Sequence, residues 1–316
     1  FAVSPRAPAT AARATGMSMS KRIYSRIAGT GSYLPEKVLT NADLEKIVDT
    51  SDEWITTRTG IRERRIASKG ETTASMGALA AARALAVAGI KADDVDLIVV
   101  ATLTPDHLMP STAVLIKGAL GSTRAAAFDL SAACSGFAYA YAVAHGFLTA
   151  GLGQRALVIG AETLSRSVDW SDRSTCVLFG DGAGAIVLEA LDLEAGQGAA
   201  SRPGTLSFEL SADPSGAYAL WIPGGVGEGA DPLIKMDGAK TYVYATRTMA
   251  AVATAAIERA GKAEQYRRIE AVMLLGDKNK ALWGDRDAID DLLKQALTLH
   301  RRTSTLHKEL KLAERA

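Results

Sequence analysis

Apolar positions along the chain gather in short runs and in longer segments of small residues, with glycine or charged residues between them. Short apolar runs bounded by turn residues are typical of buried strands. They predict strands at residues 23–31, 97–101, 125–130, 155–160, 176–179, 185–189 and 271–275. Longer segments with helical spacing predict helices at residues 41–48, 73–88, 135–150 and 241–260, with Asn41 as the N-cap of the first.

Strands that alternate with helices predict an α/β fold with a mostly parallel sheet and helices on both faces. A looser stretch rich in Gly and Pro, 191–237, precedes a second helix–strand unit at 241–275, which repeats the order of 73–101. This weak internal repeat indicates a duplicated fold. We therefore expect an extension at 1–20, a first half at 21–190 and a second half at 191–316, with a charged helical segment from 277 onward.

Composition and charge exclude several classes of protein. The 316 residues are 48% hydrophobic and 22% charged, as in folded globular proteins. Lys and Arg number 36 against 35 Asp and Glu, so no basic excess favours nucleic acid or an anionic membrane. No apolar run reaches the ~18–20 residues that span a bilayer. The two cysteines, Cys134 and Cys176, are too few for a disulfide framework, which indicates a reducing compartment.

Residues 1–20 are rich in Ala, Pro, Arg and Ser and contain no acid. They lack the apolar core of a secretory signal. Two interpretations stay open: sequence upstream of a start at Met17 or Met19, or the remnant of a plastid or mitochondrial transit peptide. We accordingly expect a cytoplasmic protein, with the plastid as the alternative.

Cys134 follows a predicted buried strand and a small-residue turn, and it stands at the start of a predicted helix. The positive end of a helix favours a thiolate, and free backbone amides there can stabilise an oxyanion. A sharp strand-to-helix turn also lifts a side chain out of the sheet, as in a nucleophile elbow. Cys134 is thus a candidate nucleophile, with a buried structural cysteine as the alternative. Cys176, inside an apolar run, is expected to belong to the core.

Trp54 is followed by four arginines: Arg58, Arg62, Arg64 and Arg65. Two interpretations stay open. Either Trp54 is an aromatic platform and the arginines bind phosphate, or all five belong to a charged surface loop that one Trp anchors. The glycine-rich run at 179–184 lacks the Lys-Ser/Thr of a phosphate loop and leads into a predicted strand, so we expect a tight turn near Cys134. None of the four histidines has metal-ligand spacing, and His145 is expected to be packed or on the surface.

Several of these pieces occur together in a fixed order: 29–35, 50–55, 58–64, 128–137, Arg173, 179–185 and 236–238. In this order and at this spacing they resemble beta-ketoacyl-acyl-carrier-protein synthase III, the family of condensing enzymes that starts bacterial and plastid fatty acid synthesis. The Trp-containing stretch and the cysteine turn make the resemblance specific. It extends from about residue 22 to about residue 261.

The resemblance implies a thiolase-like fold of five αβαβα layers, built from two similar halves with the second incomplete, and a homodimer. It implies that Cys134 accepts the acyl group of acetyl-CoA or another short acyl-CoA, which is then condensed with malonyl-acyl-carrier protein. Trp54 and Arg173 would sandwich the CoA adenine, with Arg58 near the phosphates. Met109 stands where the family often has a Phe that reaches across the dimer to shape the acyl pocket. The CoA thioester is a substrate, and neither a cofactor nor a metal is implied.

Two family motifs, His-Gln-Ala-Asn and Asn-Thr-Ser, are missing from this sequence. Gly276-Asp277-Lys278-Asn279 follow the predicted strand at 271–275, and Asn-Thr-Ser occurs nowhere. The family's His and Asn stabilise the enolate charge that forms when a malonyl thioester loses CO2, and one such donor is worth about 2.7–4 kcal/mol. The alternative function is therefore a catalytically impaired homologue or a CoA-binding pseudoenzyme. A related acyltransferase that does not decarboxylate is a third.

Overall fold

The computed structural model describes residues 22–193, 204–224 and 231–260. The strands are β1 (Arg22–Tyr33), β2 (Val38–Thr40), β3 (Glu63–Arg65), β4 (Leu97–Ala101), β5 (Ala126–Leu130), β6 (Arg155–Thr163), β7 (Asp181–Leu193), β8 (Leu220–Trp221) and β9 (Lys235–Met236). The helices are α1 (Asn41–Leu44), α2 (Asp52–Thr59), α3 (Thr73–Ala88), α4 (Thr112–Ala119), α5 (Gly136–Thr149) and α6 (Gly238–Arg259). Across these described ranges, no helix has both the length and the apolar character needed to cross a membrane.

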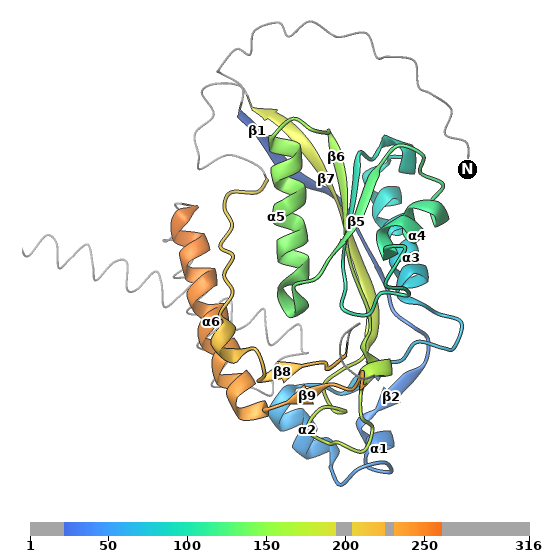
Figure 1. Cartoon of the computed structure of the whole chain (residues 1–316), viewed down its shortest axis with the longest axis vertical. Coiled ribbons are helices and arrows are strands. Elements are labelled where there is room, and N and C mark those ends of the chain that lie inside the picture. The colour runs from blue at the N-terminus through green and yellow to red at the C-terminus, as the bar shows by residue number, and fades with distance from the viewer. Residues whose placement is uncertain (1–21, 194–203, 225–230, 261–316) are drawn as a thin grey trace, which may run out of the picture.

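A five-stranded mixed sheet in the order β1-β7-β6-β4-β5 forms the centre of the fold (Figure 1). β4 is parallel to both β5 and β6, because α4 and α5 supply the crossovers that parallel neighbours need. β7 is antiparallel to both β1 and β6, and the fully described segment between β6 and β7 contains no α-helix. The prediction of a mostly parallel sheet is therefore wrong, since two of the four pairings are antiparallel.

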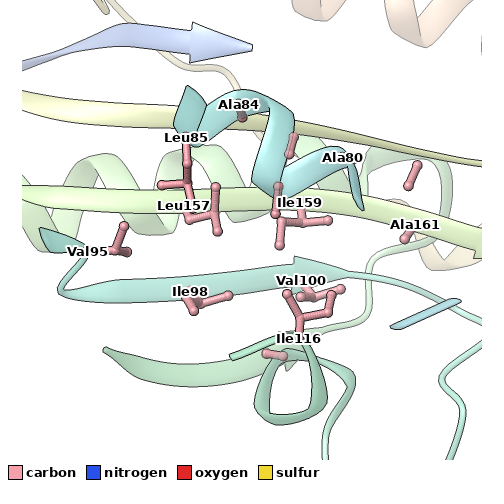
Figure 2. Close-up of a cluster of buried hydrophobic side chains, with 14 of the residues drawn as sticks. Ala80, Ala84, Leu85, Val95, Ile98, Val100, Ile116, Leu157, Ile159 and Ala161 are labelled. Atoms are coloured by element: carbon pink, nitrogen blue, oxygen red, sulfur yellow. The ribbon is translucent and has the colours of Figure 1, made fainter. Parts of the chain in front are cut away.

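Helices cover both faces of this sheet, as predicted. α3 and α4 lie on one face and α5 lies on the other (Figure 1). On the α3 side, Ala80 and Ala84 belong to the same buried cluster as Leu157 and Ile159 of β6 (Figure 2). The small side chains of α3 let its backbone approach β1 closely, so that a Cβ on Gly31 would meet the Ala80 carbonyl oxygen.

Most predicted elements are confirmed. Residues 73–88 and 97–101 match α3 and β4 at both ends. The predicted strands at 125–130 and 155–160 and helices at 135–150 and 241–260 match β5, β6, α5 and α6 to within three residues at each end. The predicted strand at 271–275 and the charged segment from 277 lie outside the described residues, and the division into two halves stays a prediction.

Two predictions near the end of the first half are wrong. Residues 176–178 form consecutive turns and 179 has no regular structure, so no strand forms here, and the Cys176 amide donates to the Asp172 carbonyl at 3.0 Å. These residues are apolar because they are packed among neighbouring segments, and their backbone does not pair with a strand. The predicted glycine turn at 180–184 is mostly strand, because β7 already begins at Asp181.

The cap of the first short helix also differs from the prediction. The Thr40 hydroxyl accepts a hydrogen bond from the Asp43 amide at 3.2 Å, and the Asp43 carboxylate accepts one from the Thr40 amide at 3.2 Å. Thr40 is therefore the N-cap, and α1 ends at Leu44 instead of residue 48. Asn41 is buried, and its side chain bonds to other segments.

Candidate active site

Cys134 stands between the end of β5 at Leu130 and the start of α5 at Gly136. The 3-10 helix Ala133–Ser135 makes this turn, and Ala133 has a left-handed φ of 48°. Left-handed backbone is strained for a residue with a Cβ, and such strain concentrates at functional sites. The turn leaves Cys134 exposed, so the alternative of a buried structural cysteine is wrong.

Close packing fixes the start of α5 against the sheet. A Cβ on Gly136 would lie 3.1 Å from the Cβ of Ala101, at the end of β4. A Cβ on Gly160 of β6 would lie 3.2 Å from the ring of Phe137. Because both positions are glycine, the first turn of α5 lies directly against β4 and β6. Cys134 is thereby held at the carboxyl ends of the parallel strands, where α/β sheets bind ligands.

A cleft of about 840 Å³ opens beside Cys134 at this edge of the sheet. The loops that follow β4 and β6 form part of its wall, together with β8 and the residues around it. Leu103, Leu164, Phe179 and Leu220 give the cleft apolar walls suited to an acyl chain. Phe179 also shows that the glycine-rich run begins near Cys134, as predicted.

Glu162, a residue that no sequence motif singled out, holds the loop after β4. Its Oε1 accepts from the Leu103 amide at 2.8 Å, and its Oε2 accepts from the Thr104 hydroxyl at 2.5 Å. Burial raises the pKa of the Glu162 carboxyl, and these hydrogen bonds oppose the rise. Leu103 and Thr104 line the cleft, so Glu162 shapes one of its walls. An acid at the end of an apolar strand is the only sequence signal for this role.

Trp54, Arg58 and Arg173 form one stack. Trp54 lies in the first turn of α2, where its amide donates to the Ser51 hydroxyl at 3.1 Å. The guanidinium carbons of Arg58 and Arg173 lie 4.5 and 4.9 Å from the centroid of the Trp54 ring. The structure thus brings together the three residues that the resemblance assigns to CoA. Guanidinium groups beside an indole suit an aromatic base and its phosphates, and this role stays a prediction.

One hydrophobic cluster connects the stack to the cleft. Ile234 is buried in this cluster, and Trp54 and Phe179 pack against it. Ile234 and Phe179 also line the cleft beside Cys134. The stack and the sulfur therefore belong to one continuous region of the molecule.

Of the residues singled out from the sequence, Arg64 lies differently from expectation, and the role of Met109 is not tested by the structure of one chain. Met109 is 86% exposed and does not line the cleft, although its neighbour Leu108 does. Its place in a partner's acyl pocket stays a prediction. Arg64 is only 4% exposed, so the idea that it binds phosphate is wrong. Arg65 pairs with Glu63, with 3.1 Å between Nη2 and Oε1.

The remaining candidates are structural. His145 is packed, as predicted: its Nδ1 lies 2.8 Å from the Ser25 hydroxyl oxygen, and burial lowers the pKa of its ring. Cys176 is fully buried and belongs to the core, as predicted, and burial raises the pKa of its thiol. Within the part of the chain that the structure describes, no three His, Cys, Asp or Glu side chains are grouped to hold a metal ion.

A mixed sheet between helices, with an exposed cysteine at the strand-to-helix turn above its parallel strands, is the arrangement that the resemblance implies for a condensing enzyme with a thiolase-like fold. The family model for 3-oxoacyl-[acyl-carrier-protein (ACP)] synthase III matches residues 128–214, which include Cys134 and Arg173. The beta-ketoacyl-[acyl-carrier-protein] synthase III of Xylella fastidiosa (strain Temecula1 / ATCC 700964) is 54% identical over 245 residues, 76% of this chain and 73% of that protein. The chain belongs to the beta-ketoacyl-acyl-carrier-protein synthase III family.

Solved structures of this family agree with the assignment. The 3-oxoacyl-[acyl-carrier-protein] synthase III of Aquifex aeolicus VF5 is 44% identical and matches 80% of each chain with a TM-score of 0.68. The synthase III of Thermus thermophilus is 42% identical, with a TM-score of 0.69 over 77% of this chain and 74% of that chain. The thiolase-like α/β fold expected from the resemblance is confirmed.

Proposed function

We propose that this chain is an acyltransferase that takes an acyl group from acetyl-CoA, or another short acyl-CoA, onto Cys134 and joins it to malonyl-acyl-carrier protein. The observation that carries the proposal is the exposed Cys134 in a cleft with apolar walls, at the carboxyl ends of parallel strands. The products are 3-oxoacyl-carrier protein, CO2 and CoA, and this reaction starts fatty acid synthesis. Membership of the synthase III family supports this reaction class.

The first step is transfer of the acyl group to sulfur. The Cys134 thiolate attacks the thioester carbonyl, the negative charge moves to the carbonyl oxygen, and collapse of this intermediate expels the CoA thiolate, which takes up a proton. The Ser135 side chain makes no capping hydrogen bond at the start of α5. The Ser135 and Gly136 amides donate to the Ala132 and Ala133 carbonyls, so an oxyanion would have to use other backbone amides of this turn, an interaction typically worth about 2.7–4 kcal/mol per donor.

The second step is decarboxylative condensation. The malonyl thioester loses CO2, the resulting enolate attacks the acyl carbonyl on Cys134, and the sulfur leaves as a thiolate. The enolate needs hydrogen-bond donors, and the His-Gln-Ala-Asn and Asn-Thr-Ser motifs that supply them in the family do not occur in this sequence. The second candidate function is therefore a homologue that binds CoA and accepts the acyl group but condenses slowly.

Intact-protein mass spectrometry separates the two functions. After incubation with acetyl-CoA, we expect one acetyl adduct on the wild type, none on Cys134→Ala and one on Cys176→Ala, because Cys176 is buried. Malonyl-acyl-carrier protein is then added. Loss of the adduct with formation of 3-oxobutanoyl-carrier protein supports the synthase, and a persistent adduct supports the second candidate. No adduct on the wild type contradicts both.

We further propose that the CoA adenine binds between Trp54 and Arg173, with Arg58 near the phosphates. The stacking of both guanidinium groups on one indole supports this proposal. So does the hydrophobic cluster that joins Trp54 to the cleft. A Trp54→Ala variant should lose affinity for CoA while Cys134 stays exposed.

We also propose a homodimer that pairs along β5. This strand is one of the two edge strands of its sheet, and Phe128 on it is 39% exposed. Unpaired edge strands with apolar side chains are ready to pair with another chain. The exposed Leu108 and Met109 would then point an apolar loop toward a partner. Light scattering should give twice the chain mass, and Phe128→Lys should halve it.

The compartment follows from the substrates. We propose that the enzyme acts where CoA and acyl carrier protein occur, in the cytoplasm or, if residues 1–20 are a transit remnant, in a plastid. Two free cysteines fit a reducing compartment. Cell fractionation with an antibody against the chain tests this location.

A further inference from the structure

Asn41 and Arg64, two buried polar residues, lie between the segments that carry the Trp54–Arg173 stack. Arg64 is 4% exposed and Asn41 is 1% exposed. Burying such groups is costly unless their donors and acceptors find partners. Apart from each other, their side-chain partners lie on three stretches of the chain, which are α2, Ile61 and the turn that contains Val177, and these show what the pair holds together.

The guanidinium of Arg64 holds the turn segment 172–178, which carries Arg173. Its Nε and Nη2 donate to the Val177 carbonyl at 3.2 and 2.6 Å. Its Nη1 donates to the Asn41 side-chain oxygen at 2.6 Å. The planar guanidinium thus spans acceptors on two segments at once, which the ammonium group of a lysine does poorly.

The side-chain amide of Asn41 continues this link to α2, the helix that carries Trp54. Its Nδ2 donates to Asp52 Oδ1 at 2.7 Å and to the Ile61 carbonyl at 2.8 Å, with Thr56 Oγ1 at 3.3 Å. Asp52 and Thr56 lie one turn apart on α2, on either side of Trp54 in the sequence.

Packing alone fixes α2 weakly. The helix has eight residues, and Ile55 is its one buried residue. A short helix with a single buried anchor can rotate or slide unless polar contacts fix it, so the Asn41 hydrogen bonds carry much of the restraint. Arg173 likewise belongs to a turn segment without strand or helix pairing, which Arg64 holds through Val177.

We propose that Arg64 and Asn41 are positioning residues for the nucleotide of CoA, because their hydrogen bonds set the spacing between α2 and the turn segment 172–178. This inference rests on the proposed binding of adenine between Trp54 and Arg173. A planar base needs contacts of about 3.5–4 Å on both of its faces, so the spacing of the two segments controls the affinity. Arg64 and Asn41 do not line the Cys134 cleft, which confines their effect to the nucleotide part of the substrate.

The test compares two acyl donors in single-turnover acetylation of Cys134 in the full chain, followed by intact mass. Acetyl-CoA carries the nucleotide, whereas S-acetyl-pantetheine has the same thioester without it. Arg64→Lys keeps the charge and removes the planar fork. Asp52→Ala removes an exposed end of the network and keeps the buried pair. Met76→Ala, a fully buried position in α3, is the control for general destabilisation.

In Arg64→Lys we expect the acetyl-CoA concentration for half-maximal acetylation to rise about tenfold. This is toward the low end of the affinity loss that follows when one stacked base loses its contact. In Asp52→Ala we expect a rise of about threefold. The maximal rates, and the half-maximal concentration of S-acetyl-pantetheine, should stay at wild-type values. If Arg64→Lys fails to fold, Asp52→Ala by itself tests the positioning role.

Parallel changes with both donors, as expected for Met76→Ala, would show a merely structural role and overturn the inference. Unchanged values with acetyl-CoA in folded Arg64→Lys and in Asp52→Ala would overturn it as well. The proposed adenine site fails separately: in that case the wild type itself uses acetyl-CoA no better than S-acetyl-pantetheine, and this inference fails with it.

Discussion

The guanidinium carbon of Arg173 lies 4.9 Å from the centroid of the Trp54 ring, and Nη1 of the same side chain donates to the Asp49 carbonyl at 2.8 Å. A planar base between the two groups needs a separation of about 7 Å, because each contact takes about 3.5 Å. Binding of adenine between them therefore requires Arg173 to move away from Trp54 and to lengthen or break its hydrogen bond to Asp49.

Removal of the Arg173 side chain should weaken CoA binding. We expect Arg173→Ala to raise the Kd for CoA by about three- to thirtyfold, since a cation–π contact is worth about 0.5–2 kcal/mol. Isothermal titration calorimetry measures this change. Arg124→Ala, which removes a 71% exposed side chain paired with Asp96, is the matched surface control and should bind as the wild type does. Equal affinities for Arg173→Ala and the wild type would contradict the proposed adenine site.

The two cysteines should differ sharply in reactivity. Cys134 is exposed, whereas Cys176 is fully buried and burial raises the pKa of its thiol. Iodoacetamide at neutral pH should therefore alkylate Cys134 at least tenfold faster than Cys176, because alkylation needs an accessible thiolate. Peptide mass mapping against time measures both rates. Prior incubation with acetyl-CoA should protect Cys134, and labelling that starts at Cys176 would mean that the cleft is closed.

The buried Glu162 should make stability depend on pH. Its pKa is raised by burial, so folding disfavours its ionised form. The stability that this carboxyl contributes is fully present below its ordinary pKa of about 4.3 and is lost as the pH rises through the raised value. We expect the unfolding free energy of the wild type to fall relative to Glu162→Gln as the pH rises from the ordinary pKa through the raised one. Urea unfolding of both proteins across this range measures the difference. A slope of the opposite sign would mean that the hydrogen bonds from Leu103 and Thr104 outweigh burial.

Gly31 of β1 and Gly146 of α5 should respond in opposite ways to substitution by alanine. A Cβ at Gly31 would meet the Ala80 backbone, which cannot move without shifting α3. We expect Gly31→Ala to lower the unfolding free energy by about 1–3 kcal/mol. Gly146→Ala in α5 has nothing within 4 Å and should raise it by about 0.5–1 kcal/mol. Denaturant titration of both variants tests the pair, and similar values for the two would show that α3 can shift without cost.

Helices and strands that end at a glycine or another recognisable turn residue could be predicted from the sequence. Gly89 ends α3 with a φ of 69°, a conformation that glycine adopts without strain, so the pattern located the last turn. Cys134 was predictable for the same reason: an apolar strand, a small-residue turn and a helix are all local features. The run at 176–179 was not, because hydrophobicity reports burial and says nothing about which backbone groups pair.

A local hydrophobic pattern also could not predict whether two neighbouring strands run parallel or antiparallel. No periodicity shows whether the chain between β6 and β7 crosses over or turns back, and here it turns back without an α-helix. Glu162 gave almost no signal for a related reason. Its importance comes from Leu103 and Thr104, which lie on a loop about sixty residues earlier in the chain.

By itself the sequence determined the order of the central strands and helices along the chain, the cysteine at the strand-to-helix turn, and the family. These follow from local spacing, from helix capping and from the order of short motifs. Only the tertiary structure decided that the guanidinium carbons of Arg58 and Arg173 lie 4.5 and 4.9 Å from the Trp54 ring centroid, and that Arg64, two residues after Arg62, turns inward to Asn41 and Val177. The direction of a long charged side chain depends on acceptors supplied by distant segments, and those acceptors meet only in the folded chain.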